Sequence, residues 1–348
     1  MSSDVITTVE GRVGRIRLNR PQAIHALTTQ MCAEMIDALI AWRDDEDVVA
    51  VLIDHAEGRG FCAGGDVVML QKSGKADGRR AAEFFHTEYR LNHLLFVYPK
   101  PIAAFMDGIT MGGGVGISQP AKFRIATENT RFAMPETAIG LFPDVGGGWY
   151  LSRLPGRMGQ YLALTGVRLD GAACKYLGLA THYVAQDKLD ELKQRMAESP
   201  DRIEGMLGAA GESPPPPKIE EHFRDIQRCF ASDRFEEVLS ALEQEEDDWA
   251  QKELAALRTK SPQACKVSLR LLAEGAHRTS FAEEMAQEYA VACRVVRRHD
   301  FAEGVRAVLI DKDNEPRWDP ATPEGVTEAM LDEIFAPLPA SERWTPVD

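Results

Sequence analysis

Three glycine-rich segments could bring main-chain amides close to a bound ligand. They are residues 61–66 (FCAGGD), 108–116 (GITMGGGVG) and 144–148 (DVGGG), and each lies beside an apolar stretch of the chain. Glycine lets the backbone approach a ligand and adopt conformations that other residues avoid. Two glycine turns that lead from strands into helices can direct two N–H groups at one point, where they would stabilise an oxygen anion forming on a carbonyl group. Each segment by itself is explained as well by a tight turn or close helix packing, and it is their combination that favours a ligand site.

Two acidic residues lie in the apolar segment 132–144 (FAMPETAIGLFPD). Glu136 and Asp144 both have strongly apolar neighbours there. Because an apolar environment disfavours the charged form of a carboxylate, each would have a raised pKa and could serve as a general base, a general acid or a nucleophile. The alternative is that Glu136 caps a helix and Asp144 caps the glycine turn that follows it.

Other chemistries are poorly matched by the sequence. A phosphate-binding P-loop would end in Gly-Lys-Ser/Thr, which none of the glycine segments does, and a dinucleotide fingerprint starting at Gly112 would need glycine where Ile117 stands. The six cysteines are scattered without a CxxC pair or Cys/His cluster, so we expect neither a metal site nor a disulfide framework. His25, His86 and His182 have no suitably spaced Ser or Asp partner and are expected to be surface or structural residues.

Composition limits the partners of this chain. Its 348 residues are 44% hydrophobic and 27% charged, which is typical of a folded globular protein of one enlarged or two ordinary domains. A formal net charge of −14 makes it a poor nucleic-acid binder, and it has no polybasic segment for an anionic membrane. No run of about 18 apolar residues predicts a membrane span. No secretory signal or transit peptide is visible at the N-terminus, so we expect a cytoplasmic location.

The elements that must position these residues alternate between strand and helix. Residues 48–53, 102–106 and 123–126 are apolar and β-branched or small, which predicts buried strands. Thr28 or Thr29 can cap a helix whose apolar side chains recur every four residues. These are Met31, Met35 and Leu39, with Cys32, Ile36 and Ile40 beside them. Helical segments between such strands predict an α/β fold built from βαβ units.

The character of the chain changes near residue 200. Residues 208–217 end in four consecutive prolines, which cannot form a helix interior and predict a hinge or surface linker. The sequence beyond is helical in pattern. We therefore expect two parts, a core of residues 1–205 and a helical C-terminal extension of residues 206–348.

Together the three segments resemble the crotonase (enoyl-CoA hydratase/isomerase) superfamily. Asn19-Arg20-Pro21 followed by Ala26-Leu27 resembles the opening motif of that superfamily, although His25 stands where Asn is usual. Within it the sequence is most similar to the 3-hydroxyisobutyryl-CoA hydrolase family, whose hallmarks resemble residues 108–118 (GITMGGGVGIS) and 132–148 (FAMPETAIGLFPDVGGG). The resemblance implies a crotonase-like (ClpP/crotonase) spiral of ββα units with a C-terminal helical region. It is specific over residues 5–200 and rests on length and helical character beyond them.

The resemblance also implies roles for individual residues. The thioester oxygen of an acyl-CoA would lie between the N–H groups of Ala63 and Gly113. Neighbouring residues of the two turns would bind the substrate, namely Gly64, Gly65, Asp66 and Gly112. Hydratases of the family use two glutamates, but here the position of the first is Gly116, which has no side chain. Asp144 stands where hydratases commonly have glycine, a feature typical of the hydrolases, and Glu88 matches an acid of that family that contacts the substrate.

These roles imply the hydrolysis of a short-chain 3-hydroxyacyl-CoA thioester, with 3-hydroxyisobutyryl-CoA, an intermediate of valine degradation, as the expected substrate. Glu136 would either attack the thioester to give an anhydride or activate a water molecule, and the sequence leaves both routes open. Asp144 would orient the acyl group and water or transfer a proton, and Glu88 would bind the 3-hydroxyl group. The alternatives are an enoyl-CoA hydratase or isomerase working with one glutamate, and a non-catalytic acyl-CoA-binding protein.

No separate cofactor is expected, because CoA enters as part of the substrate. Its phosphates need positive charge, and Arg20, Arg59 and Lys72 lie near the matching loops. The loop of residues 22–26 is expected to lie against the CoA moiety. Trimers are common in the superfamily, but the extension could cover the same surface from within one chain, so a homo-oligomer and a monomer both remain open.

Overall fold

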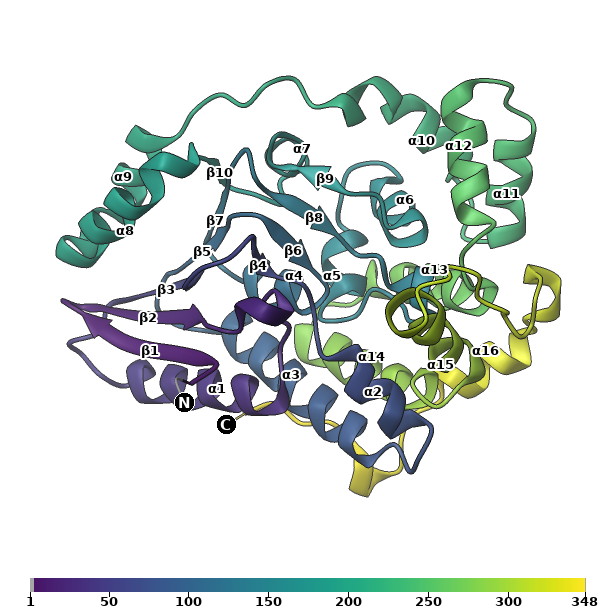
Figure 1. The fold of residues 1–348 in the computed structure, drawn as a ribbon, viewed down its shortest axis with the longest axis horizontal. Coiled ribbons are helices and arrows are strands. Elements are labelled where there is room, and N and C mark those ends of the chain that lie inside the picture. The colour runs from purple at the N-terminus through teal and green to yellow at the C-terminus, as the bar shows by residue number, and fades with distance from the viewer. Residues whose placement is uncertain (1–2, 348) are drawn as a thin grey trace.

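Two sheets organise the computed structural model, which describes residues 3–347 (Figure 1). The strand order of the larger sheet is β1-β2-β3-β5-β7-β10, and that of the smaller is β4-β6-β8-β9. The strands of the larger sheet are β1 (Val5–Glu10), β2 (Val13–Leu18), β3 (Ala50–His55), β5 (Ile102–Met106), β7 (Phe123–Ala126) and β10 (His182–Tyr183). Those of the smaller are β4 (Gly60–Cys62), β6 (Ile109–Met111), β8 (Arg131–Ala133) and β9 (Leu169–Asp170).

The chain winds through both sheets in repeated ββα turns. A strand of the large sheet is followed by one of the small sheet and then by a helix, as in β3, β4 and α2 (Val67–Gly74), and again in β5, β6 and α4 (Gly113–Ser118). Equivalent strands of successive turns pair in parallel, β3 with β5 and β5 with β7, and β4 with β6 and β6 with β8. Parallel strands end at one edge, so the loops that follow β4, β6 and β8 are brought together. This arrangement confirms the predicted crotonase-like spiral.

The predicted core elements are present. The segments predicted as strands form β3, β5 and β7, and all but one of their residues in β3 and β5 are buried. Helix α1 (Thr29–Arg43) begins where predicted, since the Thr28 side chain accepts a hydrogen bond from the Met31 N–H at 3.2 Å. Ile40 is only partly buried, because it lies at the margin of the apolar face.

The remaining helices surround the sheets. The N-terminal half contributes α3 (Arg79–Phe96), η2 (Glu136–Ile139), α5 (Gly147–Leu151), α6 (Met158–Thr165) and α7 (Gly171–Tyr176). Two more, α8 (Leu189–Glu198) and α9 (Ile203–Ala210), cover the other face of the large sheet, where Leu192 and Leu207 belong to a second apolar cluster. The C-terminal part contributes α10 (Phe223–Cys229), α11 (Phe235–Glu243), α12 (Asp248–Leu257), α13 (Pro262–Gly275), α14 (Phe281–Val295), α15 (His299–Val305), the π-helix η6 (Arg306–Ile310) and α16 (Glu328–Phe335).

The connection between the two halves is an extended segment that crosses the surface (Figure 1). The linker predicted for residues 208–217 is confirmed for residues 211–217, which contain no helix or strand, whereas residues 208–210 form the last turn of α9. The boundary expected at residue 205 falls inside α9, so the chain leaves the core a few residues later than predicted. Beyond it, α13 and α14 pack onto α5, α6 and α3, and Phe142 and Leu271 belong to one apolar core. The C-terminal helices are thus packed as part of the core.

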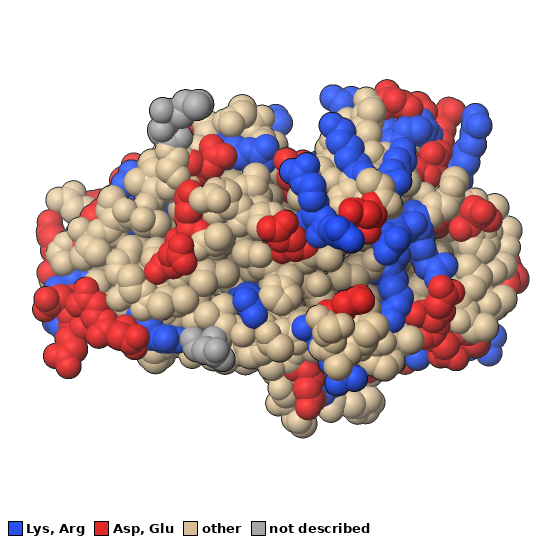
Figure 2. Space-filling view, turned by 90° about the horizontal axis from the view of Figure 1, so that it is seen from below, with Lys and Arg blue, Asp and Glu red and all other residues tan. Residues whose placement is uncertain are grey.

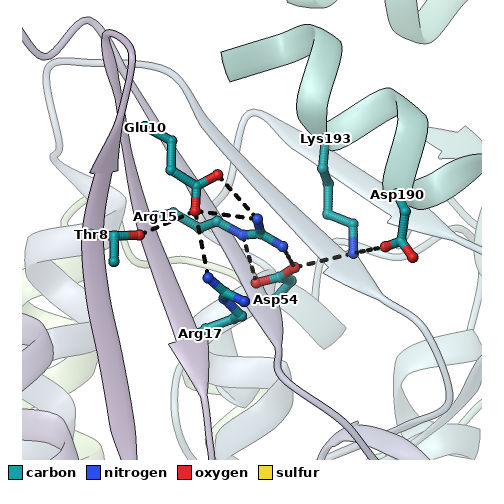
Figure 3. Close-up of polar contacts among 7 residues, drawn as sticks. All are labelled: Thr8, Glu10, Arg15, Arg17, Asp54, Asp190 and Lys193. Atoms are coloured by element: carbon teal, nitrogen blue, oxygen red, sulfur yellow. Dashed lines mark hydrogen bonds and ion pairs between the residues drawn. The ribbon is translucent and has the colours of Figure 1, made fainter. Parts of the chain in front are cut away.

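A buried ion network fastens α8 to the large sheet (Figure 3). Asp54 on β3 is 1% exposed, and its carboxylate accepts hydrogen bonds from Arg15 Nη2 at 2.7 Å and from Lys193 Nζ at 3.2 Å. Arg15 Nη1 also donates to Glu10 on β1, and Lys193 on α8 pairs with Asp190 at 3.0 Å. A buried carboxylate is tolerated only when its charge is compensated, so this network fixes α8 relative to three strands.

Among residues 3–347, no helix is long and apolar enough to cross a membrane. The same residues contain no group of three or more His, Cys, Asp or Glu side chains that could hold a metal ion.

Candidate active site

A cavity of about 730 Å³ lies where the loops after β4, β6 and β8 meet. Every residue that the sequence analysis assigned to the site lines it: Ala63, Gly64, Gly65, Asp66, Glu88, Gly112, Gly113, Glu136 and Asp144. These residues come from segments up to 81 positions apart (63 to 144), and the parallel pairing of the small sheet brings them together. The C-terminal region also contributes to the wall, through Lys260, Val308, Leu309 and Lys312.

The first two glycine segments touch at the cavity wall. A Cβ built on Gly112 would lie 3.3 Å from Gly64 Cα, and one built on Gly113 would lie 3.3 Å from the carbonyl carbon of Gly64. Gly64 has a φ of +113° and Gly112 one of +49°, both in a region that residues with side chains avoid. Glycine is therefore required here both for backbone conformation and for close approach of the two turns.

The structure corrects which amide of the first glycine segment can act as the oxyanion donor. The Ala63 N–H donates to Ile24 O at 2.9 Å, so Ala63 is wrong as the oxyanion donor. Gly64 O accepts from Leu27 N at 2.7 Å, and because the peptide is trans, the N–H of Gly65 on the same peptide points the opposite way. In the described chain, the Gly65 and Gly113 amides donate to no protein acceptor. Gly65 and Gly113 therefore have the two amides that are available to act as oxyanion donors. Nothing in the sequence shows that Ile24 O engages the Ala63 amide.

Three buried carboxyl groups surround these amides. Glu88 on α3 is 2% exposed, and Glu136 and Asp144 are each 5% exposed. Glu136 Oε1 lies 3.2 Å from a Cβ built on Gly112, and Glu88 Oε1 lies 2.6 Å from one built on Gly113, so the two glutamates flank the second turn. Glu88 Oε1 and Glu136 Oε2 have no hydrogen-bond partner among the described residues. Both oxygens can therefore bind a substrate hydroxyl group or a water molecule.

Burial and mutual repulsion give the three carboxyl groups different pKa values. Burial raises the pKa of Glu136 well above its usual value, and the charge of Asp144 raises it further. Burial likewise raises the pKa of Glu88, with added repulsion from Asp144 and Glu136. Burial raises the pKa of Asp144 only to about 6, because its Oδ2 accepts a hydrogen bond from the Tyr89 hydroxyl at 2.7 Å. Near neutral pH, Asp144 is therefore the first of the three to lose its proton, and a protonated Glu88 can donate a hydrogen bond.

Tyr89 is a site residue that the sequence analysis missed, although it follows Glu88 directly. We expect Tyr89→Phe to raise the lower of the two apparent pKa values in the rising limb of the kcat/KM profile, the one that belongs to Asp144. Its hydroxyl stabilises the charged form of Asp144, so removing it raises the pKa of that carboxyl from about 6. The measurement is kcat/KM against pH for both forms. Tyr98→Phe is the control, since the Tyr98 hydroxyl donates to Leu39 O outside the cavity lining. Superimposable profiles for Tyr89→Phe and wild type would show that the ionisation of Asp144 does not determine how kcat/KM rises with pH.

The third glycine segment is held by a carboxylate from a distant part of the chain. Glu288 on α14 is fully buried and accepts hydrogen bonds from Gly146 N at 2.8 Å and Gly148 N at 3.1 Å. Between Asp144 and these amides lies Val145, whose φ of +54° is strained for a β-branched residue. Such strain persists only where the surroundings enforce it, and the two Glu288 hydrogen bonds do so here. No signal in the sequence pairs residue 288 with this turn.

The space at Gly116 is filled. A Cβ built there would lie 2.6 Å from Val145 Cβ and 2.8 Å from Asn92 Nδ2, both below the closest contact that a real Cβ makes. A glutamate at this position could not fit without displacing two buried residues. The site therefore has three buried acids, Glu88, Glu136 and Asp144, but no room for one at residue 116.

His25 has a structural role, as predicted. Its Nδ1 accepts from Arg20 N at 2.9 Å and its Nε2 lies 2.8 Å from Glu57 O, while burial lowers its pKa. None of His25, His86 and His182 lines the cavity.

Known proteins resemble the chain over nearly its full length. A family model described as enoyl-CoA hydratase/isomerase matches residues 13–335. The chain is 41% identical over 346 residues to a protein named "3-hydroxyisobutyryl-CoA hydrolase, mitochondrial" from Gallus gallus, covering 97% of this chain and 90% of that one. The protein of the same name from Homo sapiens is 41% identical over 351 residues, with 98% and 90% covered. A crystal structure described as a carnitinyl-CoA dehydratase from Mycobacterium thermoresistibile superposes with a TM-score of 0.93 at 41% identity, covering 97% of this chain and 98% of that one.

Proposed function

The chain belongs to the enoyl-CoA hydratase/isomerase (crotonase) family, and from this premise we propose that it hydrolyses 3-hydroxyisobutyryl-CoA to 3-hydroxyisobutyrate and CoA. The observation that carries the proposal is the arrangement around Gly116. The space at this residue is closed by Val145 and Asn92, whereas Asp144 and Glu88 add two acids elsewhere in the cavity. The relatives named as hydrolases, which match over almost the whole chain, support the same reaction.

The site supports the following sequence of events. The N–H groups of Gly65 and Gly113 polarise the thioester carbonyl and stabilise the oxygen anion that forms on it. In its ionised form, Glu136 either attacks the carbonyl carbon and displaces the thiolate of CoA, giving an anhydride that water then cleaves, or removes a proton from an attacking water molecule. In either route the C–S bond breaks with departure of CoA as its thiolate, which is neutralised by the proton that the water molecule releases. Asp144 orients the attacking group from the strained turn, and Glu88 binds the 3-hydroxyl group.

The second candidate is an enoyl-CoA hydratase or dehydratase. It is favoured by the description of the superposing crystal structure as a carnitinyl-CoA dehydratase. Adding water across a C=C bond requires a base that activates the water molecule and a proton donor for the other carbon atom. Without a carboxyl group at residue 116, Glu136 would need Glu88 or Asp144 as its partner. A non-catalytic acyl-CoA-binding protein would not need Glu136 at all.

Release of CoA thiol decides between these candidates. Incubation with 3-hydroxyisobutyryl-CoA and a thiol reagent should give one thiol for each substrate consumed. Crotonyl-CoA, followed by loss of its conjugated absorbance, is the parallel substrate. Fast hydration of crotonyl-CoA with no thiol release from the hydroxy ester would overturn the hydrolase proposal. Slow or absent turnover of both would favour the binding protein.

Water labelled with heavy oxygen separates the two hydrolytic routes. Label in the Glu136 carboxyl group after turnover requires an anhydride at that side chain. Label confined to the released acid fits direct attack by water and also an anhydride that water cleaves at the acyl carbonyl, and it excludes only cleavage at the Glu136 carbonyl.

We further propose that the product enters valine degradation, since the expected substrate belongs to that route. The cytoplasmic location and the absence of a separate cofactor stay predictions from the sequence.

A further inference from the structure

We propose that the neutral ring of His25 positions the Gly65 amide of the oxyanion site, and that protonation of this ring releases the loop that holds the amide in place. The inference rests on the proposed function, because it concerns the amide that stabilises the oxygen anion. His25 is fully buried and does not line the cavity. It is therefore a positioning residue, which acts through the loop of residues 20–27 and makes no contact with substrate.

The backbone of the loop of residues 20–27 is hydrogen-bonded to the first glycine segment. The bonds are Ala63 N to Ile24 O at 2.9 Å, Leu27 N to Gly64 O at 2.7 Å, Asp66 N to Leu27 O at 3.0 Å and Cys62 Sγ to His25 O at 3.3 Å. The bond from Leu27 fixes the plane of the peptide between Gly64 and Gly65. Because that peptide is trans, its N–H points away from Leu27. The direction of the Gly65 amide therefore depends on where the loop lies.

The ring of His25 closes this loop. Its Nδ1 accepts a hydrogen bond from Arg20 N at 2.9 Å, where the loop begins, and its Nε2 donates to Glu57 O at 2.8 Å, in the turn after β3. Ile24 has a φ of +47° and His25 one of +55°, which residues with side chains rarely adopt. Such strain persists only where the surroundings enforce it, and the two bonds to the ring do so here.

Both partners of the ring require its neutral form. A carbonyl oxygen only accepts, so Nε2 carries the proton that it shares with Glu57 O, and a backbone N–H only donates, so Nδ1 has no proton. Protonation of His25 would put a second N–H in front of the Arg20 N–H. The bond that closes the loop would then be lost, and two buried donors would face each other without an acceptor.

The immediate surroundings of His25 favour the neutral ring. The titratable or charged residues against it are Arg20 of its own loop, His55 on β3, Glu57 in the turn after β3 and Cys62 on β4. Burial lowers the pKa of His25, and this effect outweighs the attraction of the Glu57 carboxylate. Burial also lowers the pKa of His55, and a charge on His25, at a ring-centroid distance of 5.4 Å, lowers it further. Burial raises the pKa of Cys62 to about 12, so this thiol is uncharged. The charged groups that act in turn on His55 are Asp54, Asp107 and Lys193.

The charge of the whole chain has the opposite sign of effect. The net charge is −14, and Figure 2 shows acidic side chains on both halves of one face, whereas the basic ones gather toward one half. Excess negative charge favours a protonated histidine, but salt screens exposed charges beyond about 8 Å, so burial decides at His25. Because folding lowers the pKa of His25, the unfolded chain binds this proton more readily. The stability that the neutral ring contributes is therefore lost as pH falls below about 6.5.

Hydrogen exchange of the full-length chain tests the proposal without substrate. His25→Phe keeps a ring but no nitrogen, and should speed the exchange of the amides in peptides covering residues 20–27 and 60–66 about tenfold at pH 7. His25→Asn should stay close to wild type, because its Oδ1 can accept from Arg20 N, it tolerates a positive φ and it cannot gain a proton. His277→Phe, at an exposed residue outside the cavity lining, is the control.

The pH dependence of exchange tests the release of the loop. Between pH 7 and pH 5, after correction for the intrinsic exchange rate, the same two peptides should become less protected in wild type. In His25→Asn their protection should stay constant. A change of the same size in both proteins, or in neither, would overturn the proposed effect of protonation. Should His25→Phe fail to fold, this comparison still decides on the role of His25.

Kinetics give the readout that separates positioning from folding alone. His25→Phe should lower kcat for thioester hydrolysis about tenfold with little change in KM, since an oxyanion donor acts mainly in the transition state and loss of a whole donor costs about 10²–10³-fold. His25→Asn should recover most of this loss. The ratio of kcat/KM for wild type to that for His25→Asn should fall from pH 7 to pH 5, and taking the ratio cancels the ionisations of Glu136 and Asp144, which both proteins share.

The outcomes distinguish this inference from the proposed function. A His25→Phe protein with the exchange and kcat of wild type would overturn the positioning role of His25. A wild type that cleaves no thioester would refute the proposed function, while the exchange of the two peptides would still decide whether His25 holds the first glycine segment.

Discussion

Glu136→Gln is expected to lower kcat for thioester hydrolysis about 10³-fold, within the range for loss of a catalytic base or nucleophile. Gln keeps the size of the side chain but can neither accept a proton nor form an anhydride. The substrate should still bind, because the amides of Gly65 and Gly113 and the cavity wall are unchanged. KM should therefore change much less than kcat. The measurement is steady-state thiol release, with Glu83→Gln on an exposed part of α3 as the matched control.

The same variant should be at least as stable as wild type at neutral pH. Because the pKa of Glu136 is raised on folding, the folded chain holds this proton at pH values where the unfolded chain has lost it. Stability therefore falls as pH rises from the unfolded value through the folded one, and the uncharged Gln avoids this loss. Denaturant unfolding at neutral pH measures the difference in the free energy of unfolding between this variant and wild type. A kcat within tenfold of wild type would contradict the role of Glu136, and a lower unfolding midpoint would contradict the raised pKa.

Glu288→Ala is expected to lower kcat about 10²-fold, although residue 288 does not line the cavity. The substitution leaves the buried N–H groups of Gly146 and Gly148 without an acceptor and removes what holds Val145 at its strained φ. Relaxation of Val145 would displace Asp144, the residue before it. Two unsatisfied buried donors should also reduce the free energy of unfolding by about 2–4 kcal/mol.

A positioning role differs from a purely structural one in measurable ways. Glu288→Gln retains one acceptor oxygen and should recover part of the lost kcat. Displacement of Asp144 from Tyr89 should also move the rising limb of the pH profile, as Tyr89→Phe does. Glu283→Ala, on the exposed side of the same helix, serves as the reference. A Glu288→Ala protein with reduced stability but normal kcat per folded molecule would leave Glu288 with a structural role alone.

The sequence predicted those parts of the site that follow from local pattern. Apolar runs located β3, β5 and β7, and the glycine segments and the acids Glu136 and Asp144 all line one cavity. Each of these signals lies within a short segment, and the ββα repeat determines how the segments meet.

The features that could not be predicted depend on contacts between distant segments. The choice of Gly65 over Ala63 follows from a hydrogen bond to Ile24 O, 39 residues earlier than Ala63. Glu288 meets Gly146 across 142 residues, and Lys260 and Lys312 reach the cavity only because α13 and α14 pack onto the core. Neither periodicity nor composition reports such pairings.

The packing around Gly116 bears on how this scaffold could change its chemistry. Inserting a second hydratase-type glutamate there would require smaller groups at Val145 and Asn92 at the same time, and Val145 sits in the turn that orients Asp144. Each intermediate on that path would carry either a steric clash or an internal void. A change from Gly to Glu at residue 116 alone would therefore not reproduce the hydratase arrangement on this scaffold.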